Sequence, residues 1–261
     1  MSSEKRFLVV TGMHRSHTSL LGSMIQRSGL PFHDDMVGAD ISNPHGHFED
    51  VAILNIHKAT LRDNRAKWFR GIDRPLDVSD ARHQELAQVI AMRFATLGPR
   101  WGFKTPQSTL FLDMFARYPQ ARFLFIHRPP APVLSSLLRR MGSQIYWRPD
   151  APGRFARAYA VYNERIAAFT ASHPERCHVV SSDRLMTDPD NVLKAASDKL
   201  GLGLDDIAAA RALVRPETIS APTNWLERIL TRHLSGGRRV RRAHEAVRVL
   251  DAVAHGATAA S

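Results

Sequence analysis

The 261-residue sequence contains one cysteine, Cys177, and no apolar run that approaches the ~18 residues of a membrane span. A single cysteine excludes an intrachain disulfide and indicates a reducing compartment. Because Cys177 opens an apolar run that ends at Val180, we interpret it as a core residue of a strand and not as a nucleophile. The apolar run at residues 7–10 is too short for a secretory signal and lacks its cleavage site. A cytoplasmic location is therefore expected.

Acidic residues are in the minority: the sequence contains 36 Lys and Arg but only 25 Asp and Glu, which gives a formal net charge of +11. Much of this excess is local, because seven Arg and two Glu lie between Glu227 and Arg248. Such an excess suggests an acidic partner, and charge alone leaves a nucleotide, a nucleic acid, a membrane surface and an acidic glycan open. The basic stretch has no aromatic residues interleaved for base stacking, so no nucleic acid is expected.

The apolar pattern predicts alternating strands and helices. Continuous apolar runs indicate buried strands at 7–11, 101–104, 121–127 and 178–181. Apolar residues at helical spacing predict helices at 18–28, 51–63, 80–97, 108–118, 132–141 and 155–169. This alternation is typical of an α/β fold with three α/β/α layers and a mostly parallel central sheet of about four or five strands. Gly236-Gly237 divides the chain into an expected domain over 1–235 and a basic tail over 236–261 that the glycines would leave mobile.

The turn after the first expected strand is rich in groups that bind phosphate. It reads Gly12-Met-His-Arg-Ser-His-Thr-Ser19 and leads into a helix, so backbone N–H groups and the positive end of the helix dipole point at one place. Arg15 adds charge and paired donors, and Ser16, Thr18 and Ser19 add hydroxyls. The nucleoside-triphosphate version of this loop ends in Gly-Lys-Ser/Thr. No Gly-Lys pair occurs here, which disfavours an ATPase or a kinase without excluding either.

A second strand-to-helix junction places a serine eight residues after an arginine. The expected strand ends in Ile126-His-Arg128, and Ser136 follows in the next helix. Ligands of open α/β sheets gather at the carboxyl ends of strands, where Arg128 is expected. A phosphate between the two residues would gain a bidentate arginine and a hydroxyl.

Together, these two motifs resemble the nucleotide-binding motifs of the sulfotransferases that use PAPS (3′-phosphoadenosine 5′-phosphosulfate), in their bacterial and Golgi-type branch. In that family the first loop, approximately G-x-x-R-S-G-T-S, binds the 5′-phosphosulfate, and the Arg/Ser pair binds the 3′-phosphate. The resemblance covers roughly residues 5 to 185 and implies a P-loop-like fold. It also implies transfer of a sulfuryl group from PAPS to a hydroxyl or amine acceptor, with adenosine 3′,5′-bisphosphate as product and no metal. The residues that it implies for nucleotide binding are Gly12, His14, Arg15, Ser16, His17, Thr18, Ser19, Arg128 and Ser136.

His17 departs from this family pattern because it stands where the family has glycine. If that glycine takes a positive φ, His17 must accept strain, which histidine tolerates better than most residues. Its imidazole could instead be placed near the sulfuryl group.

The resemblance also implies three catalytic residues, Glu49, Arg15 and Lys104. Asn43-Pro-His-Gly-His-Phe-Glu-Asp50 is similar to a family stretch N-P-x-G-x-F/Y-E, which makes Glu49 the first candidate for the general base. His45 and His47 are alternatives, and the acids at 49 and 50 can equally be residues that stabilise a helix start. Trp101-Gly-Phe-Lys-Thr-Pro106 is similar to the family's W-x-x-K-D-P and would turn Lys104 toward the sulfuryl group or the acceptor. Pro106 stands where cytosolic members carry a catalytic histidine.

Several alternatives stay open at this point. The acceptor is expected to be a small molecule or a glycan, and no motif distinguishes a carbohydrate from a phenol, a lipid or a peptide. The oligomeric state is also open. The second possible enzymatic function is that of a P-loop kinase for a small metabolite. The alternative outside enzymes is a basic protein that binds nucleic acid or acidic glycan.

Overall fold

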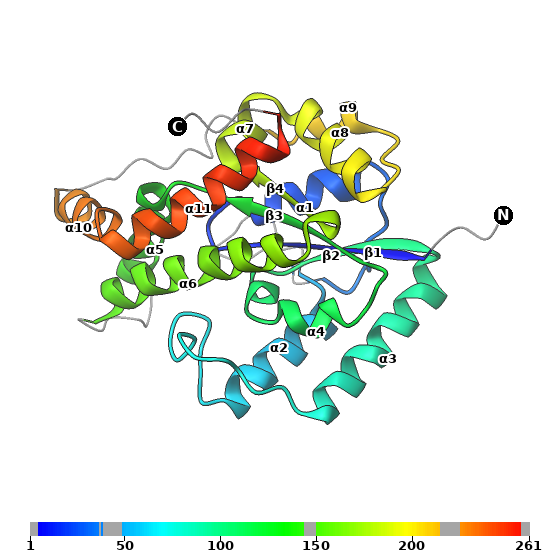
Figure 1. Ribbon diagram of the computed structural model, residues 1–261, viewed down its shortest axis with the longest axis horizontal. Coiled ribbons are helices and arrows are strands. Elements are labelled where there is room, and N and C mark those ends of the chain that lie inside the picture. The colour runs from blue at the N-terminus through cyan, green and yellow to red at the C-terminus, as the bar shows by residue number, and fades with distance from the viewer. Residues whose placement is uncertain (1–4, 37, 39–48, 144–149, 215–224, 257–261) are drawn as a thin grey trace.

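The computed structural model describes residues 5–36, 38, 49–143, 150–214 and 225–256. Four strands in these ranges form one parallel sheet in the order β2-β1-β3-β4 (Figure 1). Their bounds are Arg6–Gly12 for β1, Arg100–Lys104 for β2, Ala121–His127 for β3 and Cys177–Ser181 for β4. The expected three-layer α/β fold with a parallel central sheet is confirmed.

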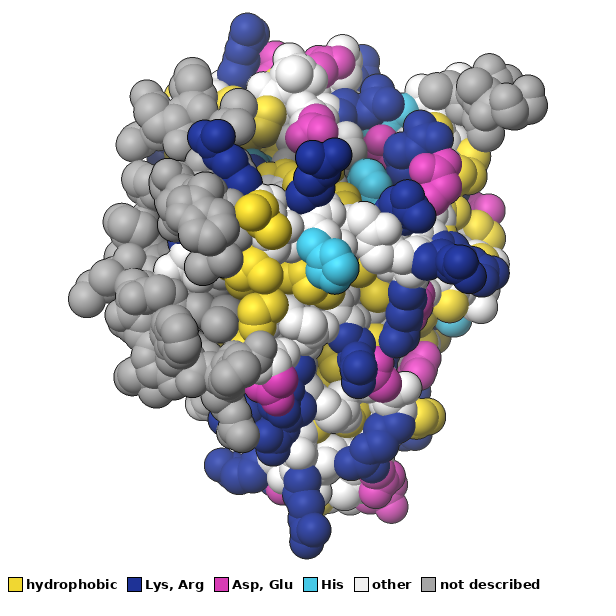
Figure 2. All heavy atoms as spheres, turned by 90° about the vertical axis from the view of Figure 1, so that its left-hand side faces the viewer, with side chains coloured by type: hydrophobic (Ala, Val, Ile, Leu, Met, Phe, Trp, Pro, Cys, Tyr) yellow, Lys and Arg dark blue, Asp and Glu magenta, His cyan; other side chains and the backbone are white. Residues whose placement is uncertain are grey.

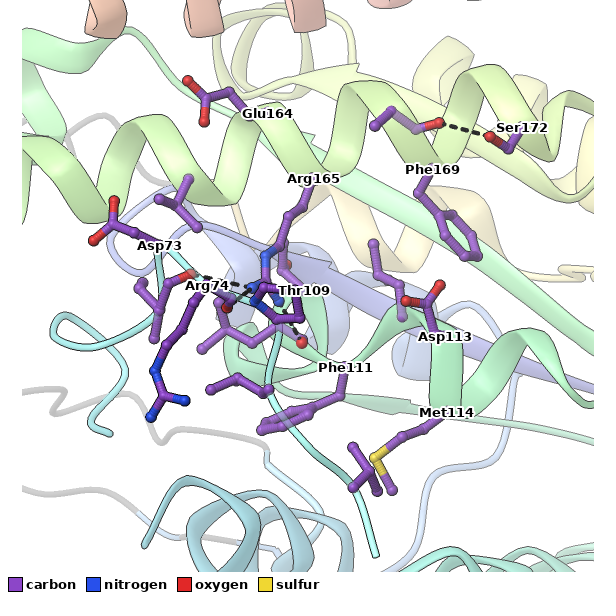
Figure 3. A pocket seen from close by; sticks show the side chains of 18 of the residues that line it. Asp73, Arg74, Thr109, Phe111, Asp113, Met114, Glu164, Arg165, Phe169 and Ser172 are labelled. Atoms are coloured by element: carbon purple, nitrogen blue, oxygen red, sulfur yellow. Dashed lines mark hydrogen bonds between the residues drawn. The ribbon is translucent and has the colours of Figure 1, made fainter. Parts of the chain in front are cut away.

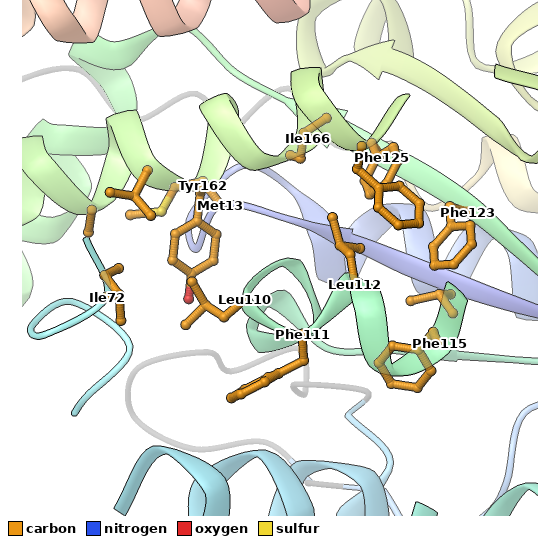
Figure 4. Packing of buried hydrophobic residues seen from close by; sticks show 14 of the residues in the cluster. Met13, Ile72, Leu110, Phe111, Leu112, Phe115, Phe123, Phe125, Tyr162 and Ile166 are labelled. Carbon is orange, nitrogen blue, oxygen red and sulfur yellow. The ribbon is translucent and has the colours of Figure 1, made fainter. Parts of the chain in front are cut away.

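The strands read as continuous apolar runs because both faces of the sheet are covered. In β1, Phe7 and Val9 point into one core, whereas Leu8 and Val10 point into a second core on the opposite face. The register pairs Val9 with Phe103 of β2 and with Phe123 of β3. Aromatic side chains therefore concentrate on one face of the sheet, where they pack against α6 (Figure 4).

The helices form a layer on each side of this sheet (Figure 1). The smaller core lies under α1 (Thr18–Arg27), α7 (Ser182–Thr187), α8 (Pro189–Leu200) and α9 (Ile207–Arg211). The larger core lies under α2 (Val51–Asp63), α3 (Asp80–Leu97), α4 (Leu112–Ala116), α5 (Pro130–Ser143), α6 (Ala151–Ser172) and α11 (Arg238–Ala254). The remaining helices are α10 (Trp225–Ser235) and the two 3₁₀ turns η1 (Pro106–Leu110) and η2 (Pro174–Arg176). No helix in the described ranges is long and apolar enough to cross a membrane.

The single helix expected over 108–118 is wrong, because the structure divides this segment into η1 and α4 with Phe111 between them. Contacts that are distant in sequence explain the break. Thr11 Oγ1, at the end of β1, donates to the carbonyl of Thr105 at 2.8 Å and lies 2.8 Å from the hydroxyl of Thr109. These bonds hold the start of the segment against β1, and a regular helix begins only after it.

The expected basic tail contains α11, which is packed against the domain. Val240, Ala243 and Val247 are buried, and α11 contacts α6 and β4. The carboxylate of Asp251 accepts a hydrogen bond of 3.0 Å from the backbone N–H of Ser181 in β4. The division at residue 235 stays a prediction, and these contacts lead us to expect a loss of stability when the tail is removed.

Candidate active site

The carboxyl ends of β1, β2 and β3 lie side by side at the left-hand end of the sheet in Figure 1. The chain turns from β1 into α1 at Gly12, which lies directly beside β3. A Cβ at this position would be 2.2 Å from the carbonyl oxygen of Ile126. Only glycine allows this approach, so the turn is held close to the end of β3.

The loop between β1 and α1 contains two residues in the left-handed region, Arg15 at φ 69° and His17 at φ 65°. His17 therefore adopts the strained conformation that its place in the motif required of it. Its Nδ1 lies 3.0 Å from the hydroxyl of Ser182, at the start of α7. Backbone bonds also brace the loop: the N–H of Ser16 donates to Met13, and the N–H of Leu21 donates to His17.

The structure brings the two predicted phosphate motifs into contact. Nε of Arg15 donates to Oγ of Ser136 at 2.9 Å, and a terminal nitrogen of Arg128 donates to the backbone carbonyl of Arg15 at 3.1 Å. Burial lowers the pKa of Arg128, and the like charges of Arg15 and Arg139 lower it further, whereas Asp183 raises it. Two guanidinium groups thus lie near each other at the end of β3, where an anion would relieve their repulsion.

A second set of predicted residues forms a chain of contacts beside this loop. The amine of Lys104, at the end of β2, donates to Ser19 Oγ at 3.1 Å and to Glu49 Oε1 at 3.3 Å. The Lys104 residue is only 1% exposed, and burial lowers the pKa of its amine, an effect that the charge of Glu49 opposes. Glu49 also forms a parallel bridge with the backbone of Lys104. The hydroxyl of Ser19, the amine of Lys104 and the carboxylate of Glu49 therefore lie side by side.

Asp50, next to Glu49, takes part in a buried ion pair that our sequence reasoning did not include. It caps α2, since its Oδ1 accepts from the N–H of Ile53 at 3.1 Å. The same carboxylate accepts two hydrogen bonds from Arg93 of α3, at 2.9 and 3.2 Å. Both side chains are buried. An acid directly before a helix signals the cap, but its arginine partner, 43 residues away, has no signal in the sequence.

The remaining predicted loop residues differ in what surrounds them. The ring of His14 packs on Trp68, with 4.3 Å between ring centroids, and lies edge-on to Tyr162 at 5.9 Å. Oγ of Ser16 is fully buried and has no hydrogen-bond partner among the described residues, and Thr18 is buried as well. An orphaned hydroxyl in a loop of this kind fits a phosphate or phosphosulfate oxygen. Both alternative bases, His45 and His47, lie outside the described residues.

A cavity near the described core lies elsewhere. It encloses about 720 Å³ along α6, between that helix, η1, α4 and the segment 72–78 (Figure 3). Arg165 spans its floor and donates to the carbonyls of Leu110 at 2.6 Å and Ile72 at 3.1 Å. No predicted site residue lines this cavity. We therefore place the candidate site at the strand ends, where the residues predicted to bind phosphate lie.

No metal site accompanies these groups in the part of the chain that the structure describes. Among the described residues, no group of three or more His, Cys, Asp or Glu side chains is arranged so that it could hold a metal ion. The polar groups at the strand ends are instead hydroxyls, guanidinium groups, one amine and one carboxylate. Such a set suits an anionic organic ligand better than a bare cation.

Comparisons with known proteins bear on the family and the fold of the chain. Residues 8–206 match the sequence model of the sulfotransferase family. No curated protein matches the chain. The fold is similar to that of sulfotransferase STF1 from Mycobacterium tuberculosis, at 17% identity and a TM-score of 0.61 over 90% of this chain and 77% of that one. It is also similar to sulfotransferase STF9 from Mycobacterium avium, at 14% identity and a TM-score of 0.58 over 86% and 70% of the two chains.

A third similar structure is close to this chain in length. It is the sulfotransferase domain from the curacin biosynthetic pathway, at 15% identity and a TM-score of 0.55 over 95% of this chain and 99% of that one. At these identities the structures report on the fold alone. The sequence match covers most of the chain and includes the β1–α1 loop, Lys104, Arg128 and Ser136. The chain therefore belongs to the sulfotransferase family.

Proposed function

We propose that the protein transfers the sulfuryl group of PAPS to a hydroxyl or amine acceptor and releases adenosine 3′,5′-bisphosphate. The observation that carries this proposal is the hydrogen bond between Arg15 and Ser136, together with the bond from Arg128 to the Arg15 carbonyl. These contacts bring a loop suited to a 5′-phosphosulfate and a pair suited to a 3′-phosphate to the same end of the sheet. A nucleotide with phosphate at both its 3′ and 5′ positions could reach both.

The residues present fit such a ligand. Ser16 offers a buried hydroxyl with no partner among the described residues. Arg15 and Arg128 offer two guanidinium groups, and the pKa of Arg128 is lowered in part by the charge of Arg15. The turn also lies at the N-terminus of α1, a ten-residue helix whose dipole favours negative charge.

The reaction we propose needs one proton acceptor and charge stabilisation on the leaving group. The acceptor oxygen or nitrogen attacks sulfur, the bond from sulfur to the 5′-phosphate oxygen breaks, and that oxygen keeps the electron pair. Glu49 takes the proton of the acceptor, and Arg15 stabilises the charge that builds on the departing phosphate. Lys104 lies within hydrogen-bond reach of both Ser19 and Glu49, so it can orient the carboxylate and steady the transferring group.

The proposal also includes a class of acceptor and a cellular location. We propose a small molecule or a glycan as the acceptor. We also propose a cytoplasmic location, which fits a chain with a single cysteine. No nucleic-acid partner is part of the proposal.

Nucleotide binding and turnover test this function separately. In a thermal-shift titration, adenosine 3′,5′-bisphosphate should raise the melting temperature at concentrations where 5′-AMP does not. Arg128→Gln/Ser136→Ala should abolish that preference and leave any weak response to 5′-AMP. Transfer of labelled sulfate from PAPS to a panel of phenol, sugar and amine acceptors then tests the chemistry. Equal stabilisation by the two nucleotides would contradict the assignment, and stabilisation by ATP with magnesium alone would favour a kinase.

A further inference from the structure

Exposed aliphatic side chains concentrate on the two C-terminal helices. Among the described residues, four large hydrophobic side chains are exposed, and three of them lie on α10 and α11. Ile229 is 57% exposed, Val249 37% and Val253 64%. Single exposed aliphatic residues are ordinary on a protein surface. Here three of the four lie on two helices that contact each other, and a group of exposed apolar side chains can mark an interaction surface.

The same two helices also carry exposed arginines that have no ion-pair partner among the described residues. Five arginines are exposed and form no ion pair with any described residue: Arg228 and Arg232 on α10, and Arg238, Arg241 and Arg242 on α11. Two neighbouring arginines behave differently. Arg239 binds Glu164 and Asp73 of the domain, and Arg248 binds Glu245 on its own helix. The five arginines thus have their charge available to a partner.

Helical spacing places two of these arginines and two of the exposed valines on the outer face of α11. Its inner face buries Val240, Ala243 and Val247. The outer stripe has the spacing 4-3-4-4 and consists of Arg238, Arg242, Glu245, Val249 and Val253. Arg248 pairs with the one acid in this stripe. The outer face therefore begins cationic and ends aliphatic.

The end of the molecule where α10 lies shows the same mixture. In Figure 2, Lys and Arg side chains are spread over the face, with hydrophobic side chains between them. An acidic polymer would neutralise the arginines but leave the aliphatic side chains in water. Proteins that bind single-stranded nucleic acid commonly stack its bases on aromatic side chains. Residues 227–256 contain no Phe, Tyr or Trp, which disfavours such a partner. A bilayer with anionic head groups satisfies both kinds of side chain, because cations bind the head groups while aliphatic groups enter the acyl boundary.

We propose that the outer face of α10 and α11 binds the surface of a membrane that contains anionic lipid. The binding is peripheral, reversible and dependent on ionic strength. It uses none of the residues that we place in the nucleotide site, so it stands or falls independently of sulfuryl transfer.

Co-sedimentation of the full chain with vesicles tests this surface. The protein should sediment with vesicles of phosphatidylcholine and phosphatidylglycerol, stay in solution with phosphatidylcholine alone, and be released by added salt. Arg238→Gln/Arg241→Gln/Arg242→Gln should weaken binding by about ten-fold or more, because each cation near an anionic surface contributes to the affinity. Arg27→Gln/Lys58→Gln/Arg62→Gln removes the same charge from exposed positions of α1 and α2 and should change binding by less than about two-fold.

A second variant separates a membrane from an acidic polymer. Ile229→Ser/Val253→Ser keeps every charge and should weaken vesicle binding by about three-fold or more, since it removes the groups that enter the bilayer. Its melting temperature should match that of the parent chain, because both side chains are exposed. No sedimentation with anionic vesicles would overturn the proposal. Equal loss in the two charge variants, or unchanged binding in Ile229→Ser/Val253→Ser, would overturn it as well, and the last result would identify a polyanion surface.

Discussion

Arg15 donates a hydrogen bond of 2.9 Å to Ser136, across 121 residues of sequence. Arg15 belongs to the loop after β1, and Ser136 belongs to α5, the helix after β3. Arg128 completes the contact by donating to the backbone of Arg15. The two motifs that we propose to bind phosphate are therefore in contact, and we expect a change in either one to affect the other.

Arg15→Ala should lower kcat by about 10² to 10³. Negative charge builds on the leaving phosphate in the transition state, so the loss of the guanidinium should affect turnover more than ground-state nucleotide binding. Steady-state kinetics with PAPS and a nucleotide titration measure the two effects. Ser136→Ala, which removes this hydrogen bond but keeps the charge of Arg15, should reduce kcat less. An unchanged kcat with a raised KM would make Arg15 a binding residue only.

Glu49→Gln should lower kcat by about 10² to 10⁴, the usual contribution of a general base. Glutamine keeps the size of the side chain and can still accept the hydrogen bond from Lys104, but it cannot take the acceptor proton. Nucleotide affinity should stay nearly the same, and a binding titration checks this. Near-normal turnover in Glu49→Gln, combined with a large loss in His17→Ala, would transfer the role of the base to a histidine.

Arg93→Met should destabilise the protein by about 3 to 5 kcal/mol, because it leaves the buried carboxylate of Asp50 without its partner. Asp50→Asn/Arg93→Met should recover much of this loss, since asparagine still caps α2 and no charge remains buried. Urea denaturation measures both. If the single and double variants are equally destabilised, the ion pair is not the cause. Because Asp50 adjoins Glu49, we also expect Arg93→Met to lower kcat.

Acid should destabilise the fold through its buried histidines. Burial lowers the pKa of His57 to about 3, whereas in the unfolded chain it titrates near 6.5. Between these values only the unfolded chain binds the proton, so the free energy of unfolding falls as the pH drops through this window. Burial lowers the pKa values of His127 and His178 to about 4, which adds to the same trend.

His57→Phe isolates this contribution. The ring lies parallel to Phe111 at 4.9 Å, so phenylalanine can occupy the same place. Between pH 7 and pH 4.5, the free energy of unfolding should fall by about 2 to 3 kcal/mol less in His57→Phe than in the parent chain. Urea denaturation at both pH values measures this difference. His233→Gln, at an exposed position of α10, is the matched control and should keep the parent's pH dependence.

Removal of residues 236–261 should lower the melting temperature strongly or make the protein insoluble. It would expose the surfaces of α6 and β4 that α11 covers, and it would remove the bond between Asp251 and the backbone of Ser181. A shorter truncation, which deletes only 257–261, leaves α11 whole and should melt near the parent's temperature. A stable, nucleotide-binding core in the longer truncation would instead support the boundary at 235.

The local pattern of the sequence determined most elements of the fold. The predicted helices at 51–63 and 80–97 have the bounds that the structure shows, and the apolar runs became the four strands. The strand, turn and helix start of each proposed phosphate motif could be predicted as well, because all three lie within one short stretch of sequence. A periodic pattern and a glycine or a cap at its end act within a few residues, so they can be read without knowledge of the rest of the chain.

The contacts between these segments were decided only by the tertiary structure. Thr11 contacts Thr109 inside the segment that was expected to be one helix, and Arg93 reaches Asp50 from another helix. Lys104 lies between Ser19 and Glu49 because β2 pairs with β1 in one particular register. The same holds for α11, whose amphipathic pattern predicts a buried face but not the surface that covers it. Such pairings depend on how the layers pack, and no short stretch of sequence contains that information.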